Sequence, residues 1–350
     1  MKNIKKYVFS AILFVLLILG TYYFILKDYS LSQFFDSLLN CSPWFILGAF
    51  LLLASYAFFH SLYLKRMLKH LGYKISWYQA LGYVFTEVYF SAITPSSMGG
   101  QPVQMMEMNR DGIPYRINSV VILLNTLIYK LALVTLAILG LIFYSQELFS
   151  FNTLFNWLVL LGFGTTILVM IGFFVLIYSK KTMEKVIQLV LFLLKKFKYK
   201  KVEEKEKKLK ESLKEYQECA AFTKRHPLIL LESYLILLCQ RISILSISYV
   251  IYLSFGLREM SIFEVVAFQV CITLGSDFMP FPGGVVVSEG LLLQANQVIY
   301  GEALATSGMM LLRGISFYLL VIFSFIFYMC FHFLKRKKAS RIKQSFDLSS

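Results

Sequence analysis

The sequence predicts an all-α polytopic integral membrane protein with about six spanning helices and two re-entrant hairpins, each broken by proline and glycine. Three observations lead to this fold class. Of the 350 residues, 58% are hydrophobic, and the mean hydropathy is +0.66. Apolar runs of about 20 residues, enough to cross ~30 Å of hydrocarbon, recur along the chain. Pro/Gly-rich stretches interrupt two further apolar regions. An outer-membrane barrel would instead show alternating segments of about 10 residues.

Six apolar runs are long enough to span a bilayer: residues 7–26, 43–64, 117–144, 156–178, 227–257 and 303–334. The first run follows Lys2, Lys5 and Lys6, as a signal peptide would. It is longer than a usual signal-peptide core, and no A-x-A-like cleavage site follows it. We therefore expect it to be a retained first helix.

The net charge of +15 comes from basic residues whose positions match the predicted membrane topology. Clusters of Lys and Arg come directly after residues 64, 178 and 334, whereas the loops 27–42 and 145–155 contain Lys27 as their only basic residue. This positive-inside asymmetry predicts a protein of the cell membrane with both termini in the cytoplasm. It also explains the charge without a nucleic-acid partner.

No enzyme-like or metal-binding pattern stands out in the sequence. The five cysteines lack metal-ligand spacing, and no Ser/His/Asp constellation or nucleotide-binding glycine loop is present. We therefore expect no catalytic residue, no metal and no cofactor.

Two apolar segments must enter and leave the membrane on the same side. Residues 76–108 contain the break TPSSMGGQP and are flanked on both sides by basic loops. Residues 261–299 contain the break PFPGG, and the chain must end with KRKK in the cytoplasm. Each segment is therefore predicted to be a re-entrant hairpin, one opening to the inside and the other to the outside.

The two halves match in content and oppose in sidedness. Gly100 precedes Lys130 by 30 positions, and Gly284 precedes Arg313 by 29. The sequence thus predicts an inverted repeat, with a first membrane half at 1–178, a basic cytoplasmic linker helix at 179–226, a second half at 227–334 and a basic tail at 335–350.

Paired Pro/Gly breaks in two inverted halves indicate a binding site near the membrane midplane. Unwound backbone is tolerated at that depth only where it is buried or lines a wet cavity, and helix ends there suit an anionic group such as phosphate. Ionisable residues within membrane segments usually face the interior and pair. We therefore expect Lys130 and Arg313 either to form ion pairs with Glu107 or Glu289 or to contact a phosphate or carboxylate. Glu87, near a hairpin entrance, and His60, near a cytoplasmic end, are predicted to be solvated or interfacial.

Three stretches give the chain a resemblance to a known family. TPSSMGGQPVQMMEMNRDG, PFPGGVVVSEG and LLRGISFYLL resemble the membrane domain of bacterial lysylphosphatidylglycerol synthase/flippases. That resemblance implies movement of lysyl-phosphatidylglycerol to the outer leaflet, which lowers binding of cationic antimicrobial peptides. The relatives make this lipid in a separate soluble domain, and this chain ends about 16 residues after its last predicted helix, too few for that domain. Relatives have an arginine near an acid after the first hairpin, whereas this chain has Asn125 and Lys130. The identity of the lipid headgroup therefore stays open.

The leading hypothesis is a non-enzymatic lipid translocator. Its predicted substrate-binding residues divide by chemistry. Those expected to bind headgroup oxygens, through side chains or the broken backbone, are Pro95, Ser96, Ser97, Gly99, Gly100, Gln101, Pro282, Gly283 and Gly284. Lys130, Arg241 and Arg313 would offset phosphate charge. Glu107, Asp277 and Glu289 would meet an amino group.

Two other classes of function stay open from the sequence. One is a phosphatidylglycerol lysyltransferase-type enzyme, or a membrane subunit for synthesis of aminoacyl lipids or polyprenyl-linked glycans. The other is an exporter of a small anion. Expected partners are membrane phospholipids and a separate synthase or glycosyltransferase.

Overall fold

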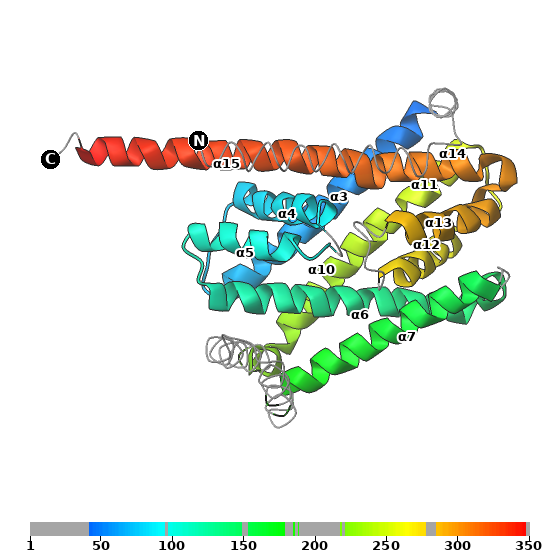
Figure 1. Cartoon of the computed structure of the whole chain (residues 1–350), viewed down its shortest axis with the longest axis horizontal. Coiled ribbons are helices and arrows are strands. Elements are labelled where there is room, and N and C mark those ends of the chain that lie inside the picture. The colour runs from blue at the N-terminus through cyan, green and yellow to red at the C-terminus, as the bar shows by residue number, and fades with distance from the viewer. Residues whose placement is uncertain are drawn as a thin grey trace, which may run out of the picture.

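The computed structural model is a bundle of helices (Figure 1). It describes residues 42–94, 97–148, 153–178, 221–277 and 285–347, with isolated positions at 185, 188 and 218. The predicted first helix, residues 7–26, lies outside the described residues, as does most of the predicted linker helix.

Four helices are long and apolar enough to cross a membrane: Pro43–His70, Tyr115–Gln146, Pro227–Ser254 and Glu302–Lys335. They correspond to α3 (Pro43–His70), α6 (Tyr115–Leu148), α10 with α11 (Pro227–Leu245, Ile247–Ser254), and α14, η3 and α15 in succession (Glu302–Arg313, Gly314–Leu319, Leu320–Asp347). A further apolar helix, α7, covers Thr153–Tyr178. The all-α polytopic fold class is therefore confirmed.

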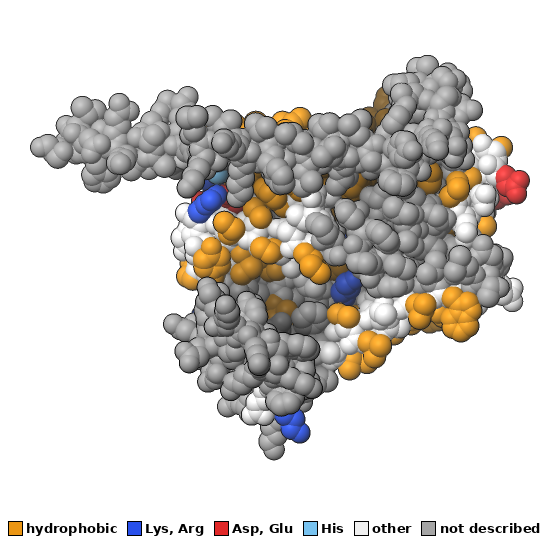
Figure 2. Space-filling view, viewed as in Figure 1, with side chains coloured by type: hydrophobic (Ala, Val, Ile, Leu, Met, Phe, Trp, Pro, Cys, Tyr) orange, Lys and Arg blue, Asp and Glu red, His pale blue; other side chains and the backbone are white. Residues whose placement is uncertain are grey.

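The outer surface of the bundle is apolar, as a surface that faces lipid must be. Figure 2 shows hydrophobic side chains over the outer faces of α5 and α7. On α7, large residues such as Trp157, Leu161 and Leu168 are more than half exposed. In water such a surface would drive association, whereas in a bilayer it contacts acyl chains.

Two pairs of short helices occupy the positions of the predicted hairpins. The first pair is α4 (Trp77–Ala92) and α5 (Gly100–Arg110), and the second is α12 (Ile262–Asp277) and α13 (Val285–Tyr300). None exceeds 16 residues, or about 24 Å at 1.5 Å per residue, which is less than the hydrocarbon thickness. The lengths suit hairpins that turn back inside the membrane, and re-entry itself stays a prediction.

The start of α4 and the turn into α5 are fixed by local hydrogen bonds. A capping box formed by Ser76 and Gln79 begins α4. After α4 ends, the Thr94 hydroxyl donates to the Phe90 carbonyl and accepts from the Gly99 N–H. Ser97 has a φ of +54°, in the left-handed region that non-glycine residues rarely occupy. The sequence break therefore corresponds to an ordered, partly strained turn.

Gly100 allows the two helices of the first hairpin to pack closely. A Cβ atom at this position would overlap the Ser91 hydroxyl and the backbone carbonyl of Glu87. The serine could rotate away, but the α4 backbone could not. The first glycine pair is thus required by helix packing as well as by the turn.

Each hairpin packs against the long helix of the opposite half. Helix α4 contacts α15, while α12 contacts α6. Helices α3 and α10 cross the middle of the bundle against each other. The first hairpin opens at the end where α6 begins, and the second opens at the end where α6 finishes (Figure 1). Hairpins that open at opposite ends and pack on opposite halves are the arrangement expected of an inverted repeat, which itself stays a prediction.

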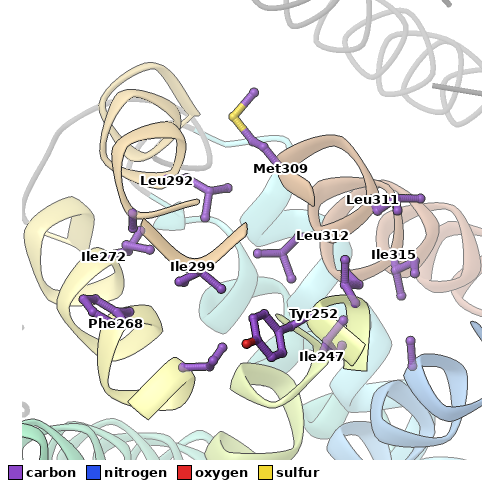
Figure 3. Packing of buried hydrophobic residues seen from close by; sticks show 14 of the residues in the cluster. Ile247, Tyr252, Phe268, Ile272, Leu292, Ile299, Met309, Leu311, Leu312 and Ile315 are labelled. Atoms are coloured by element: carbon purple, nitrogen blue, oxygen red, sulfur yellow. The ribbon is translucent and has the colours of Figure 1, made fainter. Parts of the chain in front are cut away.

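The second hairpin is anchored by the largest apolar cluster of the described residues. Figure 3 shows Leu292 and Ile299 of α13, Leu312 of α14 and Tyr252 of α11 converging on one centre. The Tyr300 hydroxyl, at the end of α13, donates to the Ser248 carbonyl at 2.9 Å. These contacts hold α13 and α14 as a unit on α11.

We predict opposite sidedness for the two hairpin entrances. In a chain without native cysteines, Lys74→Cys beside α4 and Ala303→Cys beside α13 are both exposed in the structure. A membrane-impermeant maleimide should label Ala303→Cys in intact cells and Lys74→Cys only after the cells are opened. Labelling of both positions from the same face would contradict the inverted arrangement.

We predict that Gly100→Ala destabilises the protein, because the added methyl group collides with the Glu87 carbonyl. Overpacking of this kind costs about 1–3 kcal/mol, and removing the serine hydroxyl with Ser91→Ala should not rescue it. The matched control is Gly164→Ala on α7, where a Cβ meets nothing within 4 Å. That change should be neutral or slightly stabilising. Thermal unfolding in detergent measures both, and equal midpoints would contradict the packing argument.

Candidate functional site

A cavity of about 230 Å³ lies among α10, α12, α13, α14 and η3, which all belong to the second half. Its lining combines two arginines, three uncharged polar residues and an apolar wall: Arg241, Arg313, Gln269, Thr273, Ser316, Ile244, Leu245, Ile272, Leu292 and Leu312. Both arginines were predicted as phosphate ligands from the sequence. The structure brings them into one cavity from α10 and α14, although 72 positions separate them (313 − 241).

Arg313 stands at a break in helix geometry. It is the last residue of α14, and the next turn, η3, has π-helical hydrogen bonding. Single π turns inside α-helices are frequent at functional sites, because the extra residue changes which side chains face a neighbour. The Arg313 guanidinium lies 6.0 Å from the centre of the Phe317 ring. Ser316, in the same turn, directs its hydroxyl to the Leu312 carbonyl at 2.6 Å.

Arg241 is held by aromatic rings. Its guanidinium lies 4.3 Å from the ring centre of Tyr129 and 5.6 Å from that of Tyr56. Its Nε donates to Gln240 at 2.9 Å. Lys130 contacts the same Tyr129 ring, at 5.3 Å. The rings fix the cations by cation–π attraction and orient the planar guanidinium.

The uncharged polar groups of the cavity are tied to the scaffold. Gln269 donates to the Ser248 hydroxyl at 3.0 Å, and Thr273 donates to the Gln269 carbonyl at 2.8 Å. The arrangement therefore offers fixed cationic groups beside an apolar wall. Chemically, it suits an anionic group that is attached to an apolar body.

The tip of the first hairpin occupies a different place from this cavity. Ser97 is exposed, Gly99 and Gly100 serve the turn and the packing of α5, and Gln101 donates to the Thr126 hydroxyl of α6 at 2.9 Å. Their predicted contact with headgroup oxygens stays a prediction. Pro95, Ser96, Pro282, Gly283 and Gly284 lie outside the described residues. Asp277 and Glu289 lie on described helices, but the structure does not describe their side chains.

Glu107 belongs to an ion-pair cluster near the end of the bundle where α6 begins. The carboxylate is almost fully buried and pairs with Arg110, with Lys335 at 3.6 Å and with His332 at 3.8 Å. Lys335 also binds Asp111 at 2.6 Å. The sequence suggested Lys130 as a partner of Glu107, whereas in the structure the pairs with His332 and Lys335 join the first hairpin to α15.

Comparison with known proteins places the chain in a family. The family model described as lysylphosphatidylglycerol synthase TM region matches residues 7–324. The chain belongs to this family. It is also 24% identical over 298 residues to a UPF0104 membrane protein of Archaeoglobus fulgidus, covering 83% of this chain and 87% of the relative. No solved structure matches.

A buried polar cluster around His60 and Glu87 differs from the sequence prediction. His60, expected at an interface, is buried on α3, and Glu87, expected to be solvated, has a side chain that is only 14% exposed. His60 Nε2 lies 3.4 Å from Glu87 Oε2 and 3.4 Å from the Asn125 amide nitrogen. A polar residue inside an apolar helix indicates that it faces a partner in the protein interior. One sequence does not show which helix faces meet, so the partner could not be predicted.

The cavity lining also contains polar residues that could not be selected from the sequence. These are Gln269, Thr273 and Ser316. Each is a lone polar residue in an apolar helix, and such residues are common enough that the pattern alone does not select them. Among the described residues, no group of three or more His, Cys, Asp or Glu side chains could hold a metal ion.

We predict that the Glu107 cluster stabilises the protein more than an exposed ion pair does. Lys335→Met keeps the apolar stem over the Phe331 ring but leaves Glu107, whose side chain is 2% exposed, with one cation fewer. The expected cost is about 1–3 kcal/mol. In the control Arg66→Met, the broken pair with Glu232 is 51% and 36% exposed, so the cost should be about 0–1 kcal/mol. Thermal unfolding tests this difference, and an equal loss in both variants would refute it.

Proposed function

We propose that this protein moves an anionic or aminoacylated phospholipid, such as lysyl-phosphatidylglycerol, between the leaflets of the membrane without making or breaking covalent bonds. The observation that supports this best is the shared cavity of Arg241 and Arg313. Charged residues inside a membrane cost about 2.5–3.5 kcal/mol each on insertion scales, so they are usually kept for function. Guanidinium groups bind phosphate through two parallel hydrogen bonds.

The size of the cavity favours a headgroup over a whole lipid. Pockets that enclose drug-sized molecules measure roughly 300–1,000 Å³, whereas this cavity measures about 230 Å³. A phosphate with its polar substituent would occupy it, and the acyl chains would stay in the bilayer. The wall of Leu245, Ile272 and Leu292 would contact the glycerol and the first methylene groups.

The two hairpins supply a means of alternating access. They open at opposite ends of the bundle, and each packs on the long helix of the other half. Rocking of one half against the other would expose the cavity to one side at a time. Moving a lysylated lipid outward would make the cell surface less anionic, which would reduce binding of cationic antimicrobial peptides.

We expect the protein to change where an aminoacyl lipid lies and not how much of it exists. Co-expression with a soluble aminoacyl-lipid synthase domain should leave total aminoacyl lipid unchanged and increase outer-leaflet amine labelling by an impermeant reagent. Arg313→Ala should reduce the gain about tenfold or more, because a charge-assisted hydrogen bond contributes about 1.5–3 kcal/mol and 1.4 kcal/mol is a factor of ten. Arg313→Lys should restore only part of the gain, since an ammonium lacks the planar fork.

The matched control is Arg258→Ala, which removes an exposed arginine that caps the Leu253 and Leu257 carbonyls. That variant should label like the wild type. If Arg313→Ala also labels like the wild type, the cavity is not the headgroup site. If this protein alone raises total aminoacyl lipid without a synthase, it is an enzyme and the proposal is wrong.

A further inference from the structure

The buried pair of His60 and Glu87 has no role in the headgroup site as described above. His60 lies on α3 and Glu87 on α4, with 3.4 Å between the imidazole Nε2 and the carboxylate Oε2. Among the described residues, Glu87 Oε2 and the far nitrogen of His60, Nδ1, are buried without a hydrogen-bond partner. A bare ionisable pair is costly in a low-dielectric interior, so its presence calls for a function.

Arg241 of the headgroup cavity interacts electrostatically with both groups of the pair. The Tyr56 ring of α3 lies near both His60 and Arg241, since its centre is 6.2 Å from that of the His60 ring and 5.6 Å from the Arg241 guanidinium. Asn125 of α6 contacts His60, and the buried amide of Gln104 of α5 lies against Glu87. The Tyr56 phenol also interacts electrostatically with Glu87.

The other charged groups on the helices around Glu87 are engaged with one another. Helix α4 packs on α3, α5 and α15. On α5 and α15, the charged or titratable residues Glu107, Arg110, His332 and Lys335 form the Glu107 cluster together with Asp111. Lys130 of α6 lies over the Tyr129 ring.

We propose that His60 and Glu87 form a proton-binding site that couples proton binding to anion binding at Arg241, so that the lipid headgroup and a proton cross the membrane in the same direction. This inference rests on the proposed function and adds its energy source. A proton held between Glu87 Oε2 and His60 Nε2 would give the unpartnered carboxylate oxygen a hydrogen-bond partner. Chains of carboxylates and histidines serve as proton relays in membrane transporters.

The direction of the coupling follows from competition for one guanidinium. When Glu87 is ionised, its negative charge attracts Arg241 and repels an incoming phosphate. When the pair holds a proton, that negative charge is neutralised, and the Arg241 guanidinium can attract the phosphate without competition. Protonation therefore raises the affinity for the anion, and by linkage the anion raises the affinity for the proton by the same factor.

The position of Glu87 also connects the proton site to the moving part. Its backbone carbonyl lies directly against the place that a Cβ of Gly100 would take, at the first turn of α5. Glu87 thus belongs to the contact between the two helices of the first hairpin. Proton and headgroup occupancy would together select the position of this hairpin.

The first test measures proton uptake on binding. The purified full-length protein in detergent is titrated calorimetrically with dioctanoyl phosphatidylglycerol near pH 7, in HEPES and in Tris, which differ in ionisation enthalpy. We expect the binding enthalpy to differ between the buffers by an amount equal to uptake of up to about one proton. Identical enthalpies in the two buffers would overturn the proposal, and this result needs no substitution.

Variants assign the uptake to the pair. Glu87→Gln imitates the protonated carboxyl, so its binding enthalpy should be the same in both buffers and its affinity should no longer change with pH. His60→Gln should reduce the uptake as well. The matched control is Glu232→Gln, which makes the same chemical change at a partly exposed carboxylate that pairs with Arg66 and His70. The control should keep the wild-type uptake, and wild-type uptake in Glu87→Gln would refute the assignment.

The second test separates this inference from the proposed function. Proteoliposomes with fluorescent phosphatidylglycerol in both leaflets are given an acidic interior, and the outer-leaflet fraction is read with an impermeant quencher against protein-free vesicles. We expect a net outward shift that a protonophore abolishes. If wild-type protein neither binds nor moves the lipid, the proposed function fails. If it moves the lipid equally with and without the gradient, only the proton coupling fails.

Discussion

A charged side chain in hydrocarbon must turn toward the protein interior and find a partner, and this constraint organises the described part of the molecule. Arg241 cannot face lipid without a large loss of solvation, so α10 presents it to the rings of Tyr56 and Tyr129 and to the cavity. The same requirement turns Glu107 toward α15 and Glu87 toward α3. The apolar faces that remain are directed outward to the lipid. Helix rotation in the bundle is thus set by a few ionisable groups, since leucine-rich faces pack almost equally well against lipid tails as against one another.

Each hairpin packs on a long helix of the opposite half, so movement of one half affects the other. Helix α4 rests on α15, and α12 rests on α6, so neither hairpin can shift without disturbing a long helix of the other half. Arg241 of α10 lines the cavity and also contacts the Tyr56 ring, which lies next to His60. If the proposed function holds, an event at one hairpin would reach the other through these helix contacts and the Arg241 guanidinium.

Much of the fold follows from hydropathy and from the Pro/Gly breaks, because membrane helices must satisfy their own backbone and need a minimum length. The helices at 43–70, 115–148 and 227–254 begin within two residues of the predicted runs and end within six of them. The turn before α5 also follows, since two adjacent glycines between apolar segments permit close backbone approach. Arg241 and Arg313 could be predicted as candidate ligands, because a charge within a membrane segment is costly and is usually kept for function. The partners of His60, Glu87 and Glu107 could not be predicted, because they depend on how helices distant in sequence cross.

The π turn at Gly314–Leu319 sets the rotational phase of the final helix. An additional residue in one turn rotates everything that follows by about 100° relative to an uninterrupted α-helix, since each residue advances the helix by that angle. Arg313 lies before the turn and faces the cavity, while Phe331 and Lys335 lie after it and face the first hairpin. Without that offset, the two ends of this long span could not serve both contacts. One irregular turn thus acts as a joint that lets a single span face the cavity at one end and pack on the opposite half at the other.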